Sequence, residues 1–208
     1  MRLSLRAWFA VIFVLCLETV FAEEPMKESA SSSALVAVQE PTLNFPAEIG
    51  GMKMTQQTDY EKDNPGAGVG WSYRGAVARA DVYIYSMGFE VVPSNLDSPT
   101  IAGHFQQTVG GVYEMKRLGH YADVKTVVPE EKVLIGPLPF LHAELRFTEK
   151  NQNRISHLYL GVWKGRFLKI RLTYLLSEET EGKRALAEFL QVIGKLLSAS
   201  ENQEGRPS

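Results

Sequence analysis

The sequence has one cysteine, Cys16, which lies in an apolar segment near the N-terminus. The other residues therefore cannot form disulfides, supply a thiol nucleophile or bind a metal through sulfur. Leu15 precedes the cysteine at a position where a lipoprotein signal has a small residue, so no lipid anchor is expected. A chain of this kind must be stabilised by its hydrophobic core.

Motifs of common catalytic and metal sites are missing as well. The histidines form no pair with the short spacing of metal ligands, and no Gly-x-Ser-x-Gly sequence marks a serine nucleophile. The glycine-rich segment Gly66–Gly70 leads into a strand pattern, whereas a phosphate loop requires a helix start behind it. The sequence thus predicts no metal, no cofactor and no catalytic residue, and it favours a protein without enzymatic activity.

The apolar run Ala7–Leu17 is too short to span a bilayer, which takes about 20 residues. Two arginines precede it, and "ETVFA" follows it, with Val20 and Ala22 at the −3 and −1 positions of a cleavage site. This order is typical of a secretory signal peptide. We therefore expect cleavage after Ala22 and an exported protein, periplasmic or secreted, without a transmembrane segment. An uncleaved N-terminal anchor is the alternative.

A large excess of charge of either sign is also missing. The formal net charge is −2, and it becomes −3 when residues 1–22, with two arginines and one glutamate, are removed. This balance argues against general nucleic-acid binding. The Ser- and Ala-rich segment 23–40 is predicted to be a flexible leader, 41–198 a single domain, and the polar segment 199–208 a disordered tail.

Two groups of strand patterns are separated by one helix pattern. Alternating polarity with β-branched and aromatic residues predicts strands in "MKMTQQTDYE", "VGWSYRG" and "ADVYIYSM", and later in "ADVKTVV", "KVLIG", "HAELRFTE" and "HLYLGVWKGRFLKIRLTYLLS". Between them, Ser98–Gly119 has helical spacing, with Ser98 as the N-cap, Pro99 in the first turn and Gly119 at the C-terminal cap.

A last helix follows the strands, capped by Ser177 and with an apolar stripe that includes Phe189 and Ile193. The order predicts an α+β fold: a mainly antiparallel sheet with a central helix and a C-terminal amphipathic helix packed on it. This order over Leu43–Leu197, with "RALAEFLQVIGKLL" after a strand hairpin, resembles the PsbP-like fold, named for an extrinsic protein of photosystem II. The resemblance implies an exported accessory or assembly protein rather than an enzyme.

The last hairpin separates aliphatic from polar side chains if its loop has three residues, Lys164–Arg166. Leu160 then lies opposite Ile170, whereas a two-residue turn would pair Leu160 with Lys169 and mix the faces. We therefore predict the three-residue loop. The predicted core consists of Leu158, Leu160, Ile170 and Leu172 packed against Phe189 and Ile193.

The opposite face of this hairpin is polar and aromatic. A loop at Lys150–Asn153 in the preceding hairpin pairs Ala143 with Leu160 on the aliphatic side and Glu144 with Tyr159 on the polar side. The segment 150–177 has six basic residues and no acidic one. On a chain with negative net charge, this asymmetry predicts an anionic partner: an acidic protein, a glycan or a phosphate-bearing membrane surface. The predicted binding residues, called the basic-aromatic face, are Glu144, His157, Tyr159, Trp163, Phe167, Lys169 and Arg171.

Three interpretations of the basic-aromatic face remain open: a binding face, a solvated outer face whose basic residues limit strand pairing, and burial under the helix Ser98–Gly119. The first leads to a small exported binding or accessory protein. One alternative is a hydrolase in which Glu144, His157, Tyr159 and Arg171 supply acid, base and anion-stabilising groups. Another is a small-molecule or lipid carrier with a pocket between helix and sheet.

Overall fold

The computed structural model describes residues 43–204, with side chains as far as Glu201. Its elements are β1 (Glu48–Ile49), β2 (Met52–Asp59), β3 (Val69–Arg74), β4 (Ala78–Tyr85), α2 (Pro99–Arg117), β5 (Ala122–Ile135), β6 (Leu138–Glu149), β7 (Gln152–Trp163), β8 (Arg166–Leu175), a 3-10 turn (Leu176–Glu178) and α3 (Glu179–Glu204). The fold is α+β, in the predicted order. The predicted signal peptide (1–22) and leader (23–40) lie outside the described residues, as do residues 205–208.

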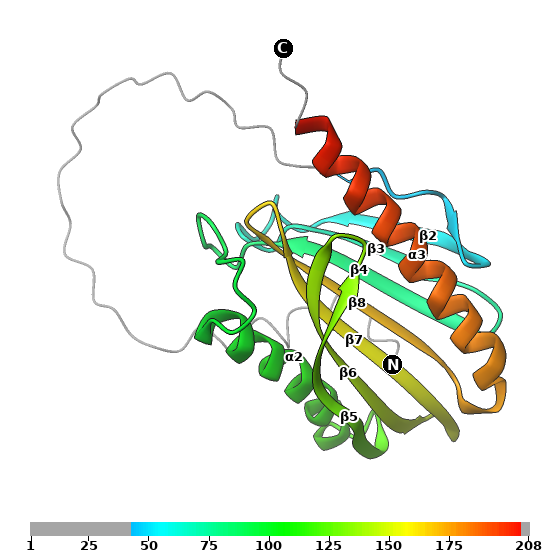
Figure 1. Cartoon of the computed structure of the whole chain (residues 1–208). Helices are drawn as coiled ribbons and strands as arrows, with labels where there is room; N and C mark the ends of the chain where they lie inside the picture. The colour runs from blue at the N-terminus through cyan, green and yellow to red at the C-terminus, as the bar shows by residue number, and fades with distance from the viewer. Residues whose placement is uncertain (1–42, 205–208) are drawn as a thin grey trace, which may run out of the picture. The chain divides into compact units, whose positions relative to one another are not determined.

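The strands form one antiparallel sheet in the order β1-β2-β3-β4-β8-β7-β6-β5. Strands β1 to β4 pair in sequence, and so do β5 to β8, so each group is an antiparallel meander. The groups meet where β8 pairs with β4. Helix α2 connects β4 in the middle of the sheet to β5 at its edge (Figure 1).

Helix α2 begins and ends where the sequence predicted. The Ser98 hydroxyl accepts a hydrogen bond from the Ile101 amide at 3.3 Å. Pro99 occupies the first turn, where backbone amides have no acceptor within the helix, so the missing amide hydrogen of proline costs no hydrogen bond. At the other end Gly119 has a φ of +77°, the left-handed conformation expected after a helix. The glycines in the middle do not interrupt the helix.

The segments "ADVKTVV" and "KVLIG", predicted as two strands, belong to one long strand, β5. Its pairing with β6 shifts register at three places, and Pro129 lies within the last of them, between Val128 and Glu131. Proline cannot donate a ladder hydrogen bond, but an edge strand with a bulge tolerates it. Because β5 is the edge strand, the chain stays extended across Pro129.

The predicted three-residue loop between β7 and β8 is wrong. Lys164 and Gly165 alone form the turn, with φ values of +48° and +71°, as in two-residue turns that match the twist of the strands. Leu160 therefore lies opposite Lys169, the pairing that the hydrophobic pattern argued against. The prediction assumed a single buried face, whereas both faces of this sheet carry a buried cluster, so either can bury aliphatic side chains.

The turn between β6 and β7 is also shorter than predicted. It consists of Lys150 and Asn151, both with positive φ, and Ala143 pairs with Leu158 instead of Leu160. The difference is a slip of two residues. Side chains alternate between faces with a period of two, so each side chain keeps its predicted face.

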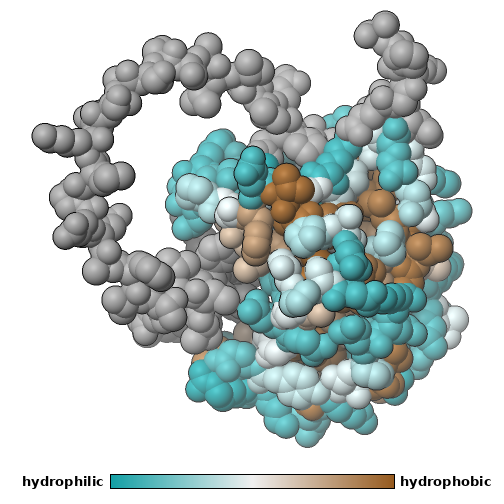
Figure 2. Space-filling model, turned by 60° about the vertical axis from the view of Figure 1, so that its left-hand side comes forward, coloured by the Kyte–Doolittle hydropathy of each residue, from teal (hydrophilic) through white to brown (hydrophobic). Residues whose placement is uncertain are grey.

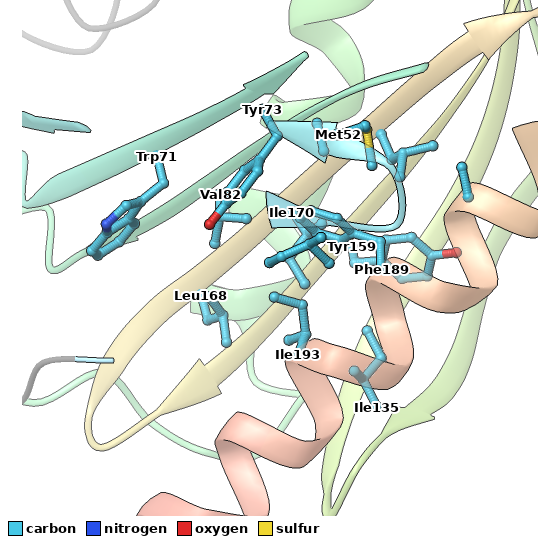
Figure 3. Close-up of a cluster of buried hydrophobic side chains, with 14 of the residues drawn as sticks. Met52, Trp71, Tyr73, Val82, Ile135, Tyr159, Leu168, Ile170, Phe189 and Ile193 are labelled. Carbon is cyan, nitrogen blue, oxygen red and sulfur yellow. The ribbon is translucent and has the colours of Figure 1, made fainter. Parts of the chain in front are cut away.

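Helix α3 covers one face of the sheet, here called the α3 face (Figure 1). Phe189 and Ile193 project from it onto Ile170 and its neighbours, as Figure 3 shows. Ile170 and Leu172 are fully buried in this cluster. This half of the predicted core is confirmed.

Helix α2 covers part of the opposite face, the α2 face. Leu158 and Leu160, predicted to pack under the C-terminal helix, instead join Ile101 and Phe105 of α2 in a second buried cluster. All four side chains are buried. The four strand residues of the predicted core are thus buried, as predicted, but they do not lie on one face. The two-residue turn pairs Leu160 with Lys169, so the aliphatic residues of β7 and β8 are on opposite faces of the sheet.

Helix α3 follows a 3-10 turn that contains Ser177, the predicted cap. The helix continues past Ser198, where the tail was predicted to begin. Beyond that point Ser200 Oγ accepts a hydrogen bond at 3.0 Å from Trp163 Nε1 of β7, which ties this part of the helix to the sheet.

Neither α2 nor α3, the two α-helices of residues 43–204, has an apolar stretch of the length that crossing a bilayer requires. On the side of the molecule that Figure 2 shows, hydrophobic residues reach the surface in patches set among hydrophilic ones.

Candidate functional site

The basic-aromatic face is not one face in the structure. Glu144, His157, Tyr159 and Trp163 lie on the α3 face, whereas Phe167, Lys169 and Arg171 lie on the α2 face. Tyr159 and Trp163 are buried in the α3 cluster and Phe167 in the α2 cluster, so these rings are part of the core. Burial under the helix Ser98–Gly119, one of the open interpretations, describes Phe167, whereas Tyr159 and Trp163 are buried on the α3 face.

The α2 face is divided into two halves. On β6 and β7 it is mainly aliphatic and packs against α2. On β3, β4 and β8 the side chains on this face are mostly charged or hydroxyl-bearing, and they continue onto the ends of β6 and β7. We call this second set the polar half; its members are Ser72, Arg74, Arg79, Asp81, Tyr83, Glu149, Arg154, Ser156, Lys169, Arg171 and Thr173.

The polar half carries an excess of positive charge on a chain whose net charge is negative. Its cations are Arg74, Arg79, Arg154, Lys169 and Arg171, and its anions are Asp81 and Glu149. Each of these residues is buried or half-buried. Their charges are therefore screened less by water and salt than charges on an open surface.

Lys169 lies where the polar half meets the apolar cluster under α2, opposite Leu160 of β7. Its Nζ is 4.7 Å from the ring centre of Tyr83 and 5.5 Å from that of Tyr85, within the range of cation–π interactions. Burial lowers the pKa of Lys169 to about 8, the Arg171 cation acts in the same direction, and Asp81 acts against both. Because the pKa is lower in the folded than in the unfolded chain, this group makes the fold less stable below pH 8 than above it.

Glu149 forms ion pairs with two of the arginines, Arg79 and Arg154. Its carboxylate lies 3.0 Å from Arg79 Nη2 and 2.7 Å from Arg154 Nε. Burial by itself would raise the pKa of Glu149, but the hydrogen bond and charge of Arg79, with the charges of Arg154 and Arg171, hold it below its usual value. Glu149 is therefore an ionised carboxylate among three guanidinium groups.

Arg171 differs from these arginines in its partners. Within the described part of the chain its hydrogen bonds go to hydroxyl groups, with Nε donating to Ser156 Oγ at 3.1 Å and Nη2 to Tyr121 OH at 3.4 Å. Its guanidinium also lies 5.8 Å from the ring centres of Tyr121 and Phe147, which stack on each other. Arg171 therefore interacts with the Glu149 carboxylate through its charge, without an ion pair or hydrogen bond to any carboxylate of the described residues.

Sequence reasoning found Lys169 and Arg171 but missed the residues around them. Arg79, Asp81 and Tyr83 alternate along "ADVYIYSM" and the residue before it, which is a signal for one shared strand face. No sequence signal says that β4 pairs with β8, a strand far along the chain. Nor does any local pattern place Glu149 beside Arg79.

A second polar cluster is buried on the α3 face. His142 Nδ1 lies 2.7 Å from a carboxylate oxygen of Glu131, His142 Nε2 lies 3.0 Å from His157 Nδ1, and His157 Nε2 lies 3.1 Å from Tyr174 OH. The rings of Tyr159 and His142 stack at 4.5 Å. Sequence reasoning assigned His157 to the basic-aromatic face but did not predict its contact with His142, because that contact depends on the register of two strands.

One set of tautomers satisfies all three hydrogen bonds when both imidazoles are neutral. A carboxylate only accepts, so His142 donates from Nδ1 to Glu131 and its Nε2 accepts. His157 then donates from Nδ1, and its Nε2 accepts from the Tyr174 hydroxyl. The cluster is thus a closed hydrogen-bond chain, a structural role that requires His157 to remain neutral.

Acid should destabilise the fold through His157. Burial lowers the pKa of this ring from 6.5 to about 4, with His142 and Lys183 acting in the same direction. Between these values the unfolded chain binds a proton that the folded chain does not, so stability falls as the pH decreases from 6.5, by on the order of 3 kcal/mol at pH 4.

The test is the slope of unfolding free energy against pH, from denaturant unfolding between pH 6.5 and 4. The slope should decrease by up to one proton in His157→Gln. Equal slopes in wild type and His157→Gln would show that His157 titrates normally.

In residues 43–204 no group of three or more His, Cys, Asp or Glu side chains is arranged to hold a metal ion. A cavity of about 460 Å³ lies between the glycine-rich turns at Gly50 and Gly75 and the first part of α3, including Arg184 and Glu188. None of its lining residues belongs to the polar half.

No family model and no curated protein matches this chain. Among the solved structures to which it is similar are the crystal structure of LpqN, involved in cell envelope biogenesis of Mycobacterium tuberculosis, and the solution structure of cyanobacterial PsbP (CyanoP) from Synechocystis sp. PCC 6803. LpqN is 13% identical over 71% of this chain and 78% of its own, with a TM-score of 0.38. CyanoP is 13% identical over 73% of this chain and 85% of its own, with a TM-score of 0.39. A PsbP protein is thus among the structures that this chain resembles, as the element order predicted. At these scores the likeness carries no conclusion about function.

Proposed function

We propose that this chain is an exported binding or accessory protein without catalysis, and that the polar half around Lys169 and Arg171 binds an anionic group of its partner. The observation that carries the proposal is the excess of half-buried positive charge. Partly buried charges cost free energy unless they are paired. The polar half has five cations and two carboxylates, so an anionic partner would bring its charges closer to balance.

The unfavourable free energy of burying the charged Lys169 supports a role of this residue in binding. At neutral pH its charged form is disfavoured by burial and by Arg171, so the charge does not contribute to the stability of the fold. A methionine at this position would fill the same volume without that cost. A partly buried group whose pKa is shifted by burial and by a neighbouring charge is typical of functional sites.

Neither alternative from the sequence receives similar support. The residues considered for a hydrolase are separated by the sheet, with Arg171 on the α2 face and Glu144, His157 and Tyr159 on the other. A carrier needs an apolar pocket between helix and sheet. Buried side chains of α3, Phe189 among them, fill that interface.

Export is the part of the proposal that depends on the N-terminal sequence. The arginines, the apolar run and the Val20-x-Ala22 site support cleavage by a signal peptidase. We expect a mature protein that begins at Glu23 and carries no lipid. Mass spectrometry of the exported protein measures this, and either a retained Met1 or an acylated Cys16 at the N-terminus would disprove it.

Charge reversal in the polar half should abolish partner capture. The double variant Lys169→Glu/Arg171→Glu replaces two cations by two anions, so an anionic partner is repelled where it was attracted. The measurement is affinity capture from envelope extract of the source organism, at about 0.1 M and about 1 M salt, over which the Debye length falls from about 10 Å to about 3 Å. Wild type should lose its partner as the salt concentration rises.

The matched control is Arg184→Glu/Lys195→Glu, which makes the same change of charge at exposed positions of α3. It should capture the same proteins as wild type, and thermal unfolding should show that both double variants are folded. If the polar-half variant and wild type capture identical sets of proteins, the polar half is a solvated part of the sheet and the proposal is wrong.

A further inference from the structure

The polar half already contains one carboxylate, that of Glu149, which shows what kind of anion its arginines can hold. The side chain of Glu149 is 10% exposed and lies among Arg79, Arg154 and Arg171. Guanidinium groups bind carboxylates through paired N–H donors in one plane, a geometry that suits acidic side chains.

The contact between Glu149 and Arg154 is incomplete. Among the described residues, the buried side-chain atoms that have no hydrogen bond are Glu149 Oε2 and Arg154 Nε. They lie 2.7 Å apart, close enough for an ion pair, but they are not aligned for a hydrogen bond. A buried N–H donor on a charged group is costly to leave without an acceptor, so Arg154 Nε is poised to donate to a better-aligned oxygen.

Arg171 supplies the second half of such a site. It is on the same face as Arg154, one strand away, and Ser156, which accepts its hydrogen bond, lies two residues from Arg154 on β7. Within residues 43–201 its hydrogen bonds go to hydroxyl groups, and Glu149, with whose charge it interacts, is in contact with Arg79 and Arg154 instead. One incoming carboxylate would therefore meet an unsatisfied donor on Arg154 and a guanidinium group on Arg171 whose hydrogen bonds go to hydroxyl groups.

We infer that the partner presents a carboxylate from an acidic protein segment, which binds between Arg154 and Arg171 in competition with Glu149. This inference rests on the proposed function and specifies its partner. The guanidinium groups are recessed, with the Arg154 side chain 16% and the Arg79 side chain 29% exposed. A flat lipid surface does not reach recessed groups, whereas an aspartate or glutamate side chain extends into them. The stacked rings of Tyr121 and Phe147 lie beside the Arg171 guanidinium group, at the edge of the proposed carboxylate site.

The test measures binding of a labelled hexaglutamate peptide to the full mature chain by fluorescence anisotropy. Arg154→Gln and Arg171→Gln should each weaken binding by about tenfold or more, because each removes one charged donor. Glu149→Gln should strengthen binding by about threefold to tenfold, because it removes the competing carboxylate. Glu144→Gln is the matched control: it lies on the same strand, pairs with Arg146 at 3.4 Å and projects to the α3 face, so it should leave the affinity unchanged.

Two further probes identify the source of the anion. Inorganic phosphate and vesicles of phosphatidylglycerol should compete with the peptide only weakly. If the vesicles bind and the peptide does not, the partner is a membrane surface and the inference is wrong. If Glu149→Gln weakens peptide binding, Glu149 does not compete, and the inference is also wrong. Should Glu149→Gln fail to fold, the arginine variants and the three probes still decide between these outcomes.

Failure of the inference is distinguishable from failure of the proposed function. If partner capture depends on Lys169 and Arg171 but hexaglutamate does not bind, the partner is still anionic and is not an acidic protein segment. If wild type and Lys169→Glu/Arg171→Glu capture the same proteins, the proposed function itself is wrong.

Discussion

Phe189→Ala should destabilise the fold by about 3–5 kcal/mol, the loss expected when a fully buried aromatic side chain is removed. The ring is fully buried and meets the edge of Tyr73 at 5.6 Å, while Ile193 lies one turn further along the same stripe of α3. Removal of the ring would leave a cavity in this cluster. Denaturant unfolding at pH 7 measures the change.

Two sets of comparison variants make this prediction specific. Ile170→Ala on the α3 face and Leu160→Ala on the α2 face should each cost about 2–5 kcal/mol, because both side chains are fully buried. Lys169→Ala should cost much less, because removing a disfavoured charge offsets the lost packing. A greater loss from Lys169→Ala than from Leu160→Ala would contradict the assignment of core and polar half.

Gly182→Ala should destabilise the fold by about 1–3 kcal/mol, although alanine is the better helix former. A Cβ atom at this position of α3 would lie 2.3 Å from both Cγ and Cδ2 of Tyr174 and 2.8 Å from its Cβ. These atoms are near the backbone of β8, so the ring cannot move aside without displacing the helix from the sheet. Tyr174 also donates to His157 in the buried hydrogen-bond chain.

Gly110→Ala in α2 is the matched control, because a Cβ atom there meets nothing within 4 Å. It should stabilise the fold by about 0.5–1 kcal/mol through helix propensity alone. The two substitutions, identical in chemistry, should thus have opposite signs in thermal unfolding. Equal gains in stability would mean that α3 is not packed on β8 at Gly182.

The local elements of the fold could be predicted from the sequence because their signals are local. Ser98, Pro99 and Gly119 mark the two ends of α2 through the backbone groups that a helix leaves unpaired. The stripe with Phe189 and Ile193 marks the buried side of α3. Each of these signals lies within a few residues of the structure that it specifies.

The register of the last hairpin could not be read from the same pattern. Alternation fixes the register between two strands only when the sheet buries a single face, and here the aliphatic residues of β7 and β8 are mainly buried on opposite faces. Turn chemistry was the better guide, because Lys164 and Gly165 fit a two-residue turn with positive φ at both positions.

The candidate site was only partly predictable for a related reason. Lys169 and Arg171 are two residues apart on one strand, so their shared face follows from the sequence. Arg79 and Glu149 reach them through the pairing of β4 with β8 and through ion pairs between distant segments. Such contacts depend on the whole sheet, which no short stretch of sequence specifies.

Site-specific photo-crosslinking from β2 tests most directly whether the polar half is the binding surface. Gln56 and Gln57 are adjacent and both exposed, but Gln56 lies opposite Ser72 on the α2 face and Gln57 opposite Trp71 on the α3 face. A benzoylphenylalanine at either position probes one face of the same strand. In envelope extract, position 56 should crosslink an anionic partner that Lys169→Glu/Arg171→Glu removes, and position 57 should not. Crosslinks from position 57 alone, or from position 56 regardless of the double variant, would contradict binding at the polar half.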